Sequence, residues 1–132
     1  MINLDKTAPS SQFYSWNNFR CAYDVLSPIN STPEGVPLLL IHPIGVGLSR
    51  HFWQRFCDEW HKKGNRNSIY NPDLLGCGES DMPHVAYTPI DWAEQLQYFI
   101  KTIVKEPVAL VVLGGLYPVA IELVKEEPDL IA

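Results

Sequence analysis

The fold assignment starts from residues 70–81, which have the sequence YNPDLLGCGESD. Residues 68–71 are predicted to be a short strand, and proline and glycine then interrupt regular structure at close intervals. Asp and Ser side chains in such a segment commonly hydrogen-bond to the backbone of a turn rather than act as acid and base. The stretch is therefore predicted to be a strand followed by a structured loop, with candidate structural residues Asp73, Gly76, Gly78, Ser80 and Asp81.

Upstream of this loop lies a second strand-to-loop transition. Residues 36–41 (VPLLLI) are an unbroken apolar run, which predicts a strand buried on both faces. Residues 42–47 (HPIGVG) form a glycine-bearing loop, and Ser49 is a suitable N-cap for a helix. The aromatic residues of that helix recur at helical spacing, so we expect them in the core rather than in a ligand site; they are Phe52, Trp53, Phe56 and Trp60.

The N-terminal part of the chain has the pattern of a β-hairpin. Residues 13–16 and 19–26 are aromatic and β-branched runs, and Asn17 and Asn18 between them favour a tight turn. Residues 1–11 are polar, and we expect a loose N-terminus there. A single domain is predicted over residues 12–132.

Downstream, strands and helices continue to alternate. Thr88, Pro89 and Asp91 form a helix start with a capping-box pattern. A strand is predicted at residues 108–113 and a last helix from Pro118. The order β-β-β-α-β-α-β-α predicts an α/β fold with an N-terminal β-hairpin and a mostly parallel sheet that carries helices on both faces.

These segments resemble the N-terminal half of an α/β-hydrolase. The stretch LLLIHPIGVG resembles the strand and oxyanion loop of that family, and YNPDLLGCGESD resembles the P-D-x-x-G-x-G-x-S-D pattern of its esterase, epoxide hydrolase and dehalogenase branch. The stretch VVLGGLYPVAIEL occupies the place of the nucleophile elbow. The resemblance implies a partial α/β-hydrolase fold and hydrolase chemistry of the ester type or a related kind.

The elbow departs from the pattern that this resemblance implies. Aligning G-x-nucleophile-x-G on residues 114–118 places Leu116 at the nucleophile and Pro118 at the closing glycine. A shift by one residue places Tyr117 there, but its pKa near 10 makes it a poor nucleophile. A leucine gains nothing from the strained conformation of a nucleophile, so we expect any positive φ to fall on Gly114 or Gly115.

The resemblance also implies roles for the loop after the first parallel strand. His42 would organise this loop, Pro43 replaces a family glycine, and the backbone N–H groups of Ile44 and Tyr117 would form the oxyanion hole. The triad acid and histidine would lie beyond Ala132, which we expect to fall in the helix after the elbow. No catalytic residue is then intact in this chain.

Two functions follow from the resemblance. The first is a non-catalytic binding or scaffolding protein, with an apolar floor at Leu116 and Tyr117 that suits a small apolar ligand. The alternative is a fragment of a hydrolase that a longer gene product or a partner chain completes. In either case the strand at residues 108–113 lies at an unprotected sheet edge, so we expect a homodimer or a complementing chain to pair with it.

Composition restricts the remaining classes of function. The net charge of −5 and the lack of a basic stripe argue against nucleic acid. Three widely spaced cysteines without a C-x-x-C pair predict no disulfide framework, no metal site and a cytoplasmic protein. Residues 107–124 are apolar and long enough to require a membrane test, but Gly114, Gly115 and Pro118 divide them. We expect no cofactor.

Overall fold

A five-stranded mixed sheet with the order β1-β2-β4-β3-β5 forms the centre of the computed structural model, which describes residues 11–132. The β4, β3 and β5 strands are parallel, and β1 and β2 add an antiparallel hairpin at one edge. This arrangement confirms the predicted α/β class with its N-terminal hairpin. The strands are β1 (Gln12–Trp16), β2 (Phe19–Leu26), β3 (Leu38–Ile41), β4 (Ile69–Pro72) and β5 (Ala109–Val112).

The hairpin turn has the backbone that its sequence predicts. Asn17 and Asn18 have φ values of 50° and 66°, so both central residues are left-handed, as in a two-residue hairpin turn that matches the twist of its strands. Most of the predicted loose N-terminus, residues 1–10, lies outside the residues that the structure describes.

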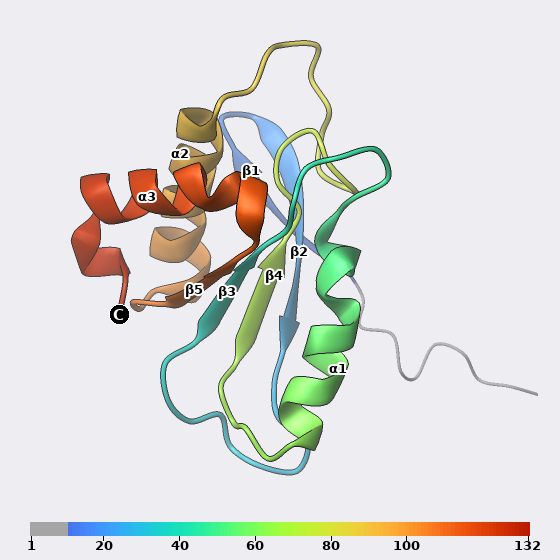
Figure 1. Cartoon of the computed structure of the whole chain (residues 1–132), viewed down its shortest axis with the longest axis vertical. Helices are drawn as coiled ribbons and strands as arrows, with labels where there is room; N and C mark the ends of the chain where they lie inside the picture. The colour runs from blue at the N-terminus through green and yellow to red at the C-terminus, as the bar shows by residue number, and fades with distance from the viewer. Residues whose placement is uncertain (1–10) are drawn as a thin grey trace, which may run out of the picture.

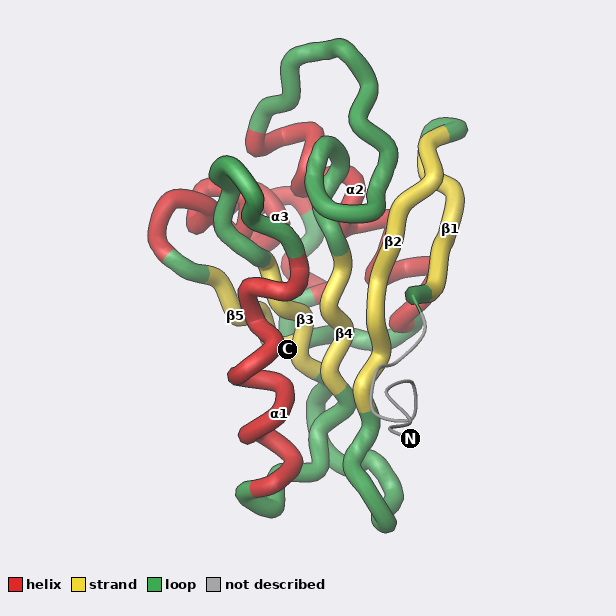
Figure 2. The backbone as a smooth tube through the Cα atoms, turned by 90° about the vertical axis from the view of Figure 1, so that its right-hand side faces the viewer, coloured by secondary structure: helices red, strands yellow, loops and turns green. Residues whose placement is uncertain are grey.

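Helices cover the two faces of the sheet. One face carries α1 (Gln54–Lys62), and the other carries α2 (Pro89–Phe99) and α3 (Tyr117–Glu126) (Figure 1). Figure 2 shows α1 in front of the strands, with the β1–β2 hairpin at the right. A 3₁₀ turn at Arg50–Trp53 precedes α1, and the Ser49 hydroxyl accepts a hydrogen bond from the His51 N–H at its start.

The β3 strand separates two hydrophobic clusters. Leu39 and Ile41 pack on the side of α2 and α3, whereas Leu38 and Leu40 pack on the side of α1. All four residues are buried, as the unbroken apolar run predicts. The α1 aromatics Trp53, Phe56 and Trp60 pack against the second cluster, while Phe52 is exposed, so the expected core stripe holds for three of its four members.

The α2 helix begins as its sequence predicts and ends in a way that the sequence does not show. Thr88 and Asp91 form a full capping box, with Pro89 in the first helical turn. After Phe99 the helix widens into a π-helical turn at Ile100–Val104, and Lys105 ends it in the left-handed conformation at φ 66°.

The C-terminal residues correct one expectation. The last helix ends at Glu126, a 3₁₀ turn follows at Pro128–Leu130, and Ile131 forms a parallel bridge with Val108. The chain therefore does not end within the helix, and the edge of β5 is not bare over its whole length.

The apolar run at residues 107–124 is divided between β5, a 3₁₀ turn and α3. Within residues 11–132, every helix is too short or too polar to cross a membrane.

Candidate functional site

The loop after β4 is held to β2 by its polar side chains. The Ser80 hydroxyl accepts a hydrogen bond from the Ala22 N–H at 2.9 Å and donates one to the Asp73 carbonyl at 3.0 Å. The Asp81 carboxylate accepts a hydrogen bond from the Arg20 N–H at 2.7 Å. The hydrogen bonds of Ser80 and Asp81 are thus to the backbone, which is the role that the sequence indicates for them.

The two glycines of this loop lie where a side chain would clash with neighbouring atoms. Gly78 has a φ of 54°, and a Cβ placed on it would lie 2.3 Å from a carboxylate oxygen of Asp73. Gly76 has a φ of 88°, and a Cβ there would lie 2.5 Å from the ring of Tyr87. Both positions combine a left-handed backbone with a close approach, so side chains are excluded there for reasons of packing.

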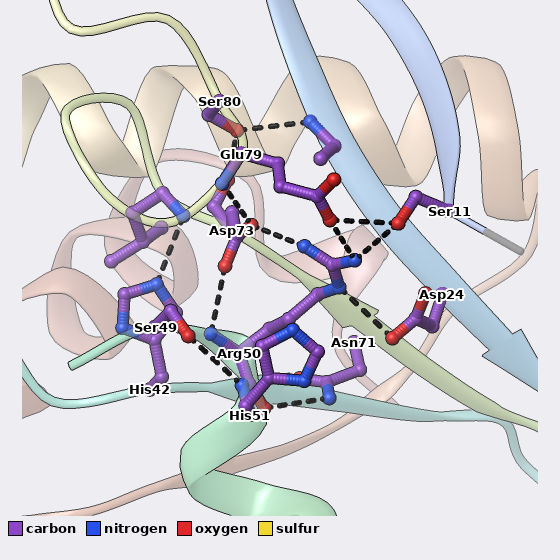
Figure 3. A network of polar contacts seen from close by, with 12 residues as sticks. Ser11, Asp24, His42, Ser49, Arg50, His51, Asn71, Asp73, Glu79 and Ser80 are labelled. Atoms are coloured by element: carbon purple, nitrogen blue, oxygen red, sulfur yellow. Dashed lines mark hydrogen bonds and ion pairs between the residues drawn. The ribbon is translucent and has the colours of Figure 1, made fainter. Parts of the chain in front are cut away.

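A buried arginine organises the same region, and sequence reasoning did not identify it. Arg50 is 1% exposed, and its guanidinium donates to Asp24 at 2.9 Å and to Glu79 at 2.7 Å (Figure 3). It also forms an ion pair with Asp73, which is fully buried. Figure 3 shows the guanidinium between the three carboxylates, which come from β2 and from the loop after β4. The Arg50 side chain therefore connects its own 3₁₀ turn before α1 to β2 and to the loop after β4.

The Asp73 carboxylate is fully engaged in this network. Besides its ion pair with Arg50, it accepts hydrogen bonds from the Arg50 N–H at 2.7 Å and the Glu79 N–H at 2.8 Å. Burial disfavours the charged guanidinium, but hydrogen bonds to Asp24 and Glu79 outweigh it, so the pKa of Arg50 is raised overall. Asp73 is thus a structural carboxylate that holds a loop and a cation in place.

His42 fastens the loop after β3 to the loop after β4. Its Nδ1 lies 2.9 Å from the Pro43 carbonyl oxygen, and its Nε2 accepts the Leu74 N–H at 3.0 Å. Because Nε2 accepts a hydrogen bond, the ring is neutral with its proton on Nδ1. These contacts support the loop-organising role that the sequence suggests and leave neither nitrogen available as a base.

Burial lowers the pKa of His42, and this predicts a loss of stability in acid. The unfolded chain takes up this proton as the pH falls through about 6.5, whereas the folded chain takes it up only at a lower pH. The free energy of unfolding should therefore fall as the pH drops below about 6.5, with a slope of at most about 1.4 kcal/mol per pH unit from this residue. Urea unfolding across this range should show the slope in the parent and a shallower one in His42→Gln. Equal slopes would contradict the prediction.

The strand-to-helix turn after β5 contains the position expected for the nucleophile. Gly114 has a φ of 49°, which confirms that the positive φ falls on one of the two glycines. Leu116 has a φ of −102° and is only 8% exposed within the core. A nucleophile must project from a sharp turn at the top of the sheet, whereas Leu116 packs into the core. The residue of this turn with a left-handed backbone is Gly114.

The register of the sheet places the other residues predicted for the site. Parallel pairing aligns Ile41 with Val112, so the loops that follow β3 and β5 leave the same end of the sheet. His42, Pro43 and Ile44 therefore emerge beside the turn, and Tyr117 starts α3 there with 60% of its surface exposed. The predicted apolar floor thus separates into a buried Leu116 and an exposed Tyr117.

An open groove of about 480 Å³ lies between the loops that follow β3 and β4. Burial and, to a smaller extent, the Asp73 carboxylate raise the pKa of the Cys77 thiol, which lines the groove, to about 11. Cys77 is therefore a neutral thiol at pH 7 rather than an activated nucleophile. The apolar side chains lining the groove are Ile44, Val46, Leu48 and Met82.

Histidine, cysteine and acidic side chains do not gather into a metal-binding group anywhere in residues 11–132. The network around Arg50 contains three carboxylates, but the guanidinium already bonds to all of them.

A mixed α/β sheet with a structured loop after β4 and a strand–turn–helix elbow after β5 defines the class of the protein. Residues 38–123, most of the chain, match the Alpha/beta hydrolase family. The chain belongs to this family.

Known relatives are considerably longer than this chain. Uncharacterised proteins of Mycobacterium tuberculosis and Mycobacterium bovis are 29% identical over 130 residues, which cover 96% of this chain and 34% of each relative. The chain therefore spans about a third of the length of the curated relatives it matches.

Solved structures show the same partial coverage. A serine hydrolase involved in carbazole degradation aligns with a TM-score of 0.76 at 20% identity, over 94% of this chain and 45% of that one. An epoxide hydrolase from Vigna radiata aligns with a TM-score of 0.72 at 20% identity, over 93% and 37%. At this identity the likeness establishes the fold.

Proposed function

We propose that this chain is a non-catalytic α/β-hydrolase unit with a binding or scaffolding role. The observation that carries the proposal is Gly114 at the apex of the elbow. Catalysis in this fold requires a nucleophilic side chain at that point, held near backbone N–H donors. Glycine keeps the backbone conformation of the turn and supplies no side chain.

Neighbouring groups do not supply a substitute nucleophile or base. The Ser80 hydroxyl is occupied by backbone hydrogen bonds on both sides, and Cys77 is held as a neutral thiol. Both nitrogens of His42 are engaged in the loop. A nucleophile needs a free base within hydrogen-bond reach, and these contacts leave none of the three in that arrangement.

The surroundings of the elbow favour an apolar ligand. Tyr117, Ile44 and Val46 are exposed at the same end of the sheet, next to the groove that Leu48 and Met82 help to line. Apolar surface with few fixed polar groups suits a small hydrophobic molecule. This surface supports the binding role, and we propose that the ligand lies there.

The proposal predicts that a fluorophosphonate probe does not label residues 112–118 and that turnover of p-nitrophenyl acetate does not depend on the elbow. Mass spectrometry of the labelled protein and an ester assay on the parent, Gly114→Ser and Tyr117→Phe would test this. Labelling within the elbow, or parent turnover that either substitution abolishes, would refute the non-catalytic role.

A matched pair of variants tests the position of the apex itself. A Cβ at Gly114 meets no atom within 4 Å, so Gly114→Ser should cost about 1 kcal/mol of stability, from its positive φ alone. Leu116→Ser removes a buried side chain and should cost at least about 2 kcal/mol. Chemical denaturation measures both losses of stability. A larger loss in Gly114→Ser than in Leu116→Ser would place residue 116 at the exposed tip.

A further inference from the structure

The groove between the loops that follow β3 and β4 originates in the topology of the sheet. These two strands are adjacent and parallel, with Leu38 paired to Ile69 and Leu39 paired to Tyr70. The chain leaves β3 for α1 on one face of the sheet, and it leaves β4 for α2 on the other face (Figure 1). Loops that diverge in this way open a crevice at the carboxyl ends of their strands, where α/β proteins commonly bind ligands.

Buried hydrogen bonds hold the wall of the groove that the loop after β4 provides. On the α1 side, the Arg50 N–H donates to the Asp73 carboxylate at 2.7 Å, and the two side chains form an ion pair. On the α2 side, the fully buried Gln95 accepts the Leu75 N–H at 2.9 Å and donates to the Tyr14 hydroxyl at 3.0 Å. The wall is therefore preformed, and binding requires little ordering of this loop.

The lining of the groove consists of apolar side chains and backbone without side chains. Ile44, Val46 and Leu48 come from the loop after β3, and Met82 comes from the loop after β4. Val46 is fully exposed, and Met82 is largely exposed. The glycines of the lining are Gly45, Gly47, Gly76 and Gly78. Because glycine lets a ligand approach the backbone closely, this lining suits a flat apolar molecule.

The charged residues of the two loops are acidic. Residues 43–49 and 74–88 contain no lysine or arginine, whereas Glu79 and Asp81 lie in the second of these stretches. Arg50, which follows the first stretch, is buried and already bonds to three carboxylates. Neither loop therefore offers a free cation to a ligand in the groove.

The thiol that lines the groove responds to this negative charge. Burial and the Asp73 carboxylate both raise the pKa of Cys77, so the negatively charged form of its side chain is disfavoured there. A carboxylate or sulfonate on a ligand would meet the same conditions. It would lose its hydration without gaining a cation, which makes its transfer into the groove unfavourable.

We propose that this groove binds an uncharged apolar molecule and excludes anionic molecules of similar shape. This role for the groove rests on the binding function proposed above, and it places the ligand between the loops after β3 and β4 rather than on the elbow. The apolar walls stabilise the body of the ligand, and the acidic loops select against a negative charge. Selectivity therefore arises from repulsion as well as from contact.

The test compares two fluorescent probes by titration against the full chain. N-phenyl-1-naphthylamine is uncharged at neutral pH, and 8-anilino-1-naphthalenesulfonate has the same ring system with a sulfonate added. The uncharged probe should bind more tightly to the parent, because the sulfonate gains no cation in the groove. Met82→Lys supplies that cation, so the ratio of the two dissociation constants should shift toward the sulfonate by at least about 10-fold.

A matched variant separates the groove from a general effect of added charge. Ile29→Lys introduces the same charge at an exposed position in the loop after β2. This loop lies at the opposite end of the sheet, because Leu26 pairs with Ile69 at the start of β4. Ile29→Lys should leave the ratio unchanged. Val46→Lys places the charge on the other wall of the groove, and it should reproduce the shift even if Met82→Lys does not fold.

Three results would overturn the proposal. The first is that neither probe binds to the parent. The second is that the ratio in both Met82→Lys and Val46→Lys equals the ratio in Ile29→Lys. The third is a shift in Tyr117→Lys alone, which would place the ligand on the elbow and leave the binding role intact. The ester assay is independent of all three, because turnover that depends on the elbow would refute the non-catalytic role without changing the probe ratio.

Discussion

Arg50→Met should lower the free energy of unfolding by about 3–5 kcal/mol. The methionine fills much of the same volume, but it leaves Asp73 and Asp24 buried without their cation. Two uncompensated carboxylates in a buried site cost more than the lost attraction alone. The expected loss is a large share of the stability of a domain of this size. Urea denaturation followed by circular dichroism would therefore resolve it.

Two further variants make the interpretation specific. Lys101→Met breaks the exposed pair between Lys101 and Glu127, and it should change stability by no more than about 1 kcal/mol. Arg50→Lys keeps the charge but cannot reach three carboxylates with a planar fork, so its loss should fall between the two. An Arg50→Met variant within 1 kcal/mol of the parent would show that the network contributes little.

Gly78→Ala should also be strongly destabilising, by about 3 kcal/mol. The added Cβ would lie 2.3 Å from a carboxylate oxygen of Asp73, so the backbone or the carboxylate must move. Movement of Asp73 weakens its hydrogen bonds to Arg50 and to the Glu79 N–H. A single methyl group thus disturbs the most densely bonded part of the loop.

Gly47→Ala separates this contact from the cost of backbone conformation. Gly47 has a φ of 77°, and a Cβ there meets no atom within 4 Å. Its substitution should cost only the left-handed strain, about 1 kcal/mol. Equal losses in the two variants, measured by thermal or urea unfolding, would mean that the contact with Asp73 relaxes freely.

Much of the fold could be predicted from local sequence because its signals are local. Two adjacent asparagines specify the hairpin turn, and Thr88 with Asp91 specifies the start of α2. The unbroken apolar run of β3 predicts burial on both faces, since no polar position alternates within it. Each of these features is decided within a few residues of the chain.

The features that sequence reasoning missed depend on distant residues. Arg50 gains its role from Asp24 and Asp73, 26 and 23 positions away, and nothing near it marks it as buried. The sequence did contain one signal for this network, which is Asp73 directly after a buried strand. A buried carboxylate requires a cation or hydrogen-bond donors nearby. The elbow is ambiguous for another reason: adjacent glycines allow more than one register, and the burial of Leu116 and the positive φ of Gly114 favour the register with Gly114 at the turn.

The close fit of Gly78 against Asp73 has a consequence for how such sequences are interpreted. Because the contact between Gly78 and Asp73 concerns the packing of the loop, the loop pattern does not by itself indicate that a chain carries a nucleophile. Residues at the tip of the elbow are under no such restraint, since Gly114 has open space around it. A search for active members of the family should therefore weigh the tip of the elbow above the glycine loop. The loop after β4 indicates membership of the family, whereas the residue at the tip of the elbow indicates whether a nucleophile is present.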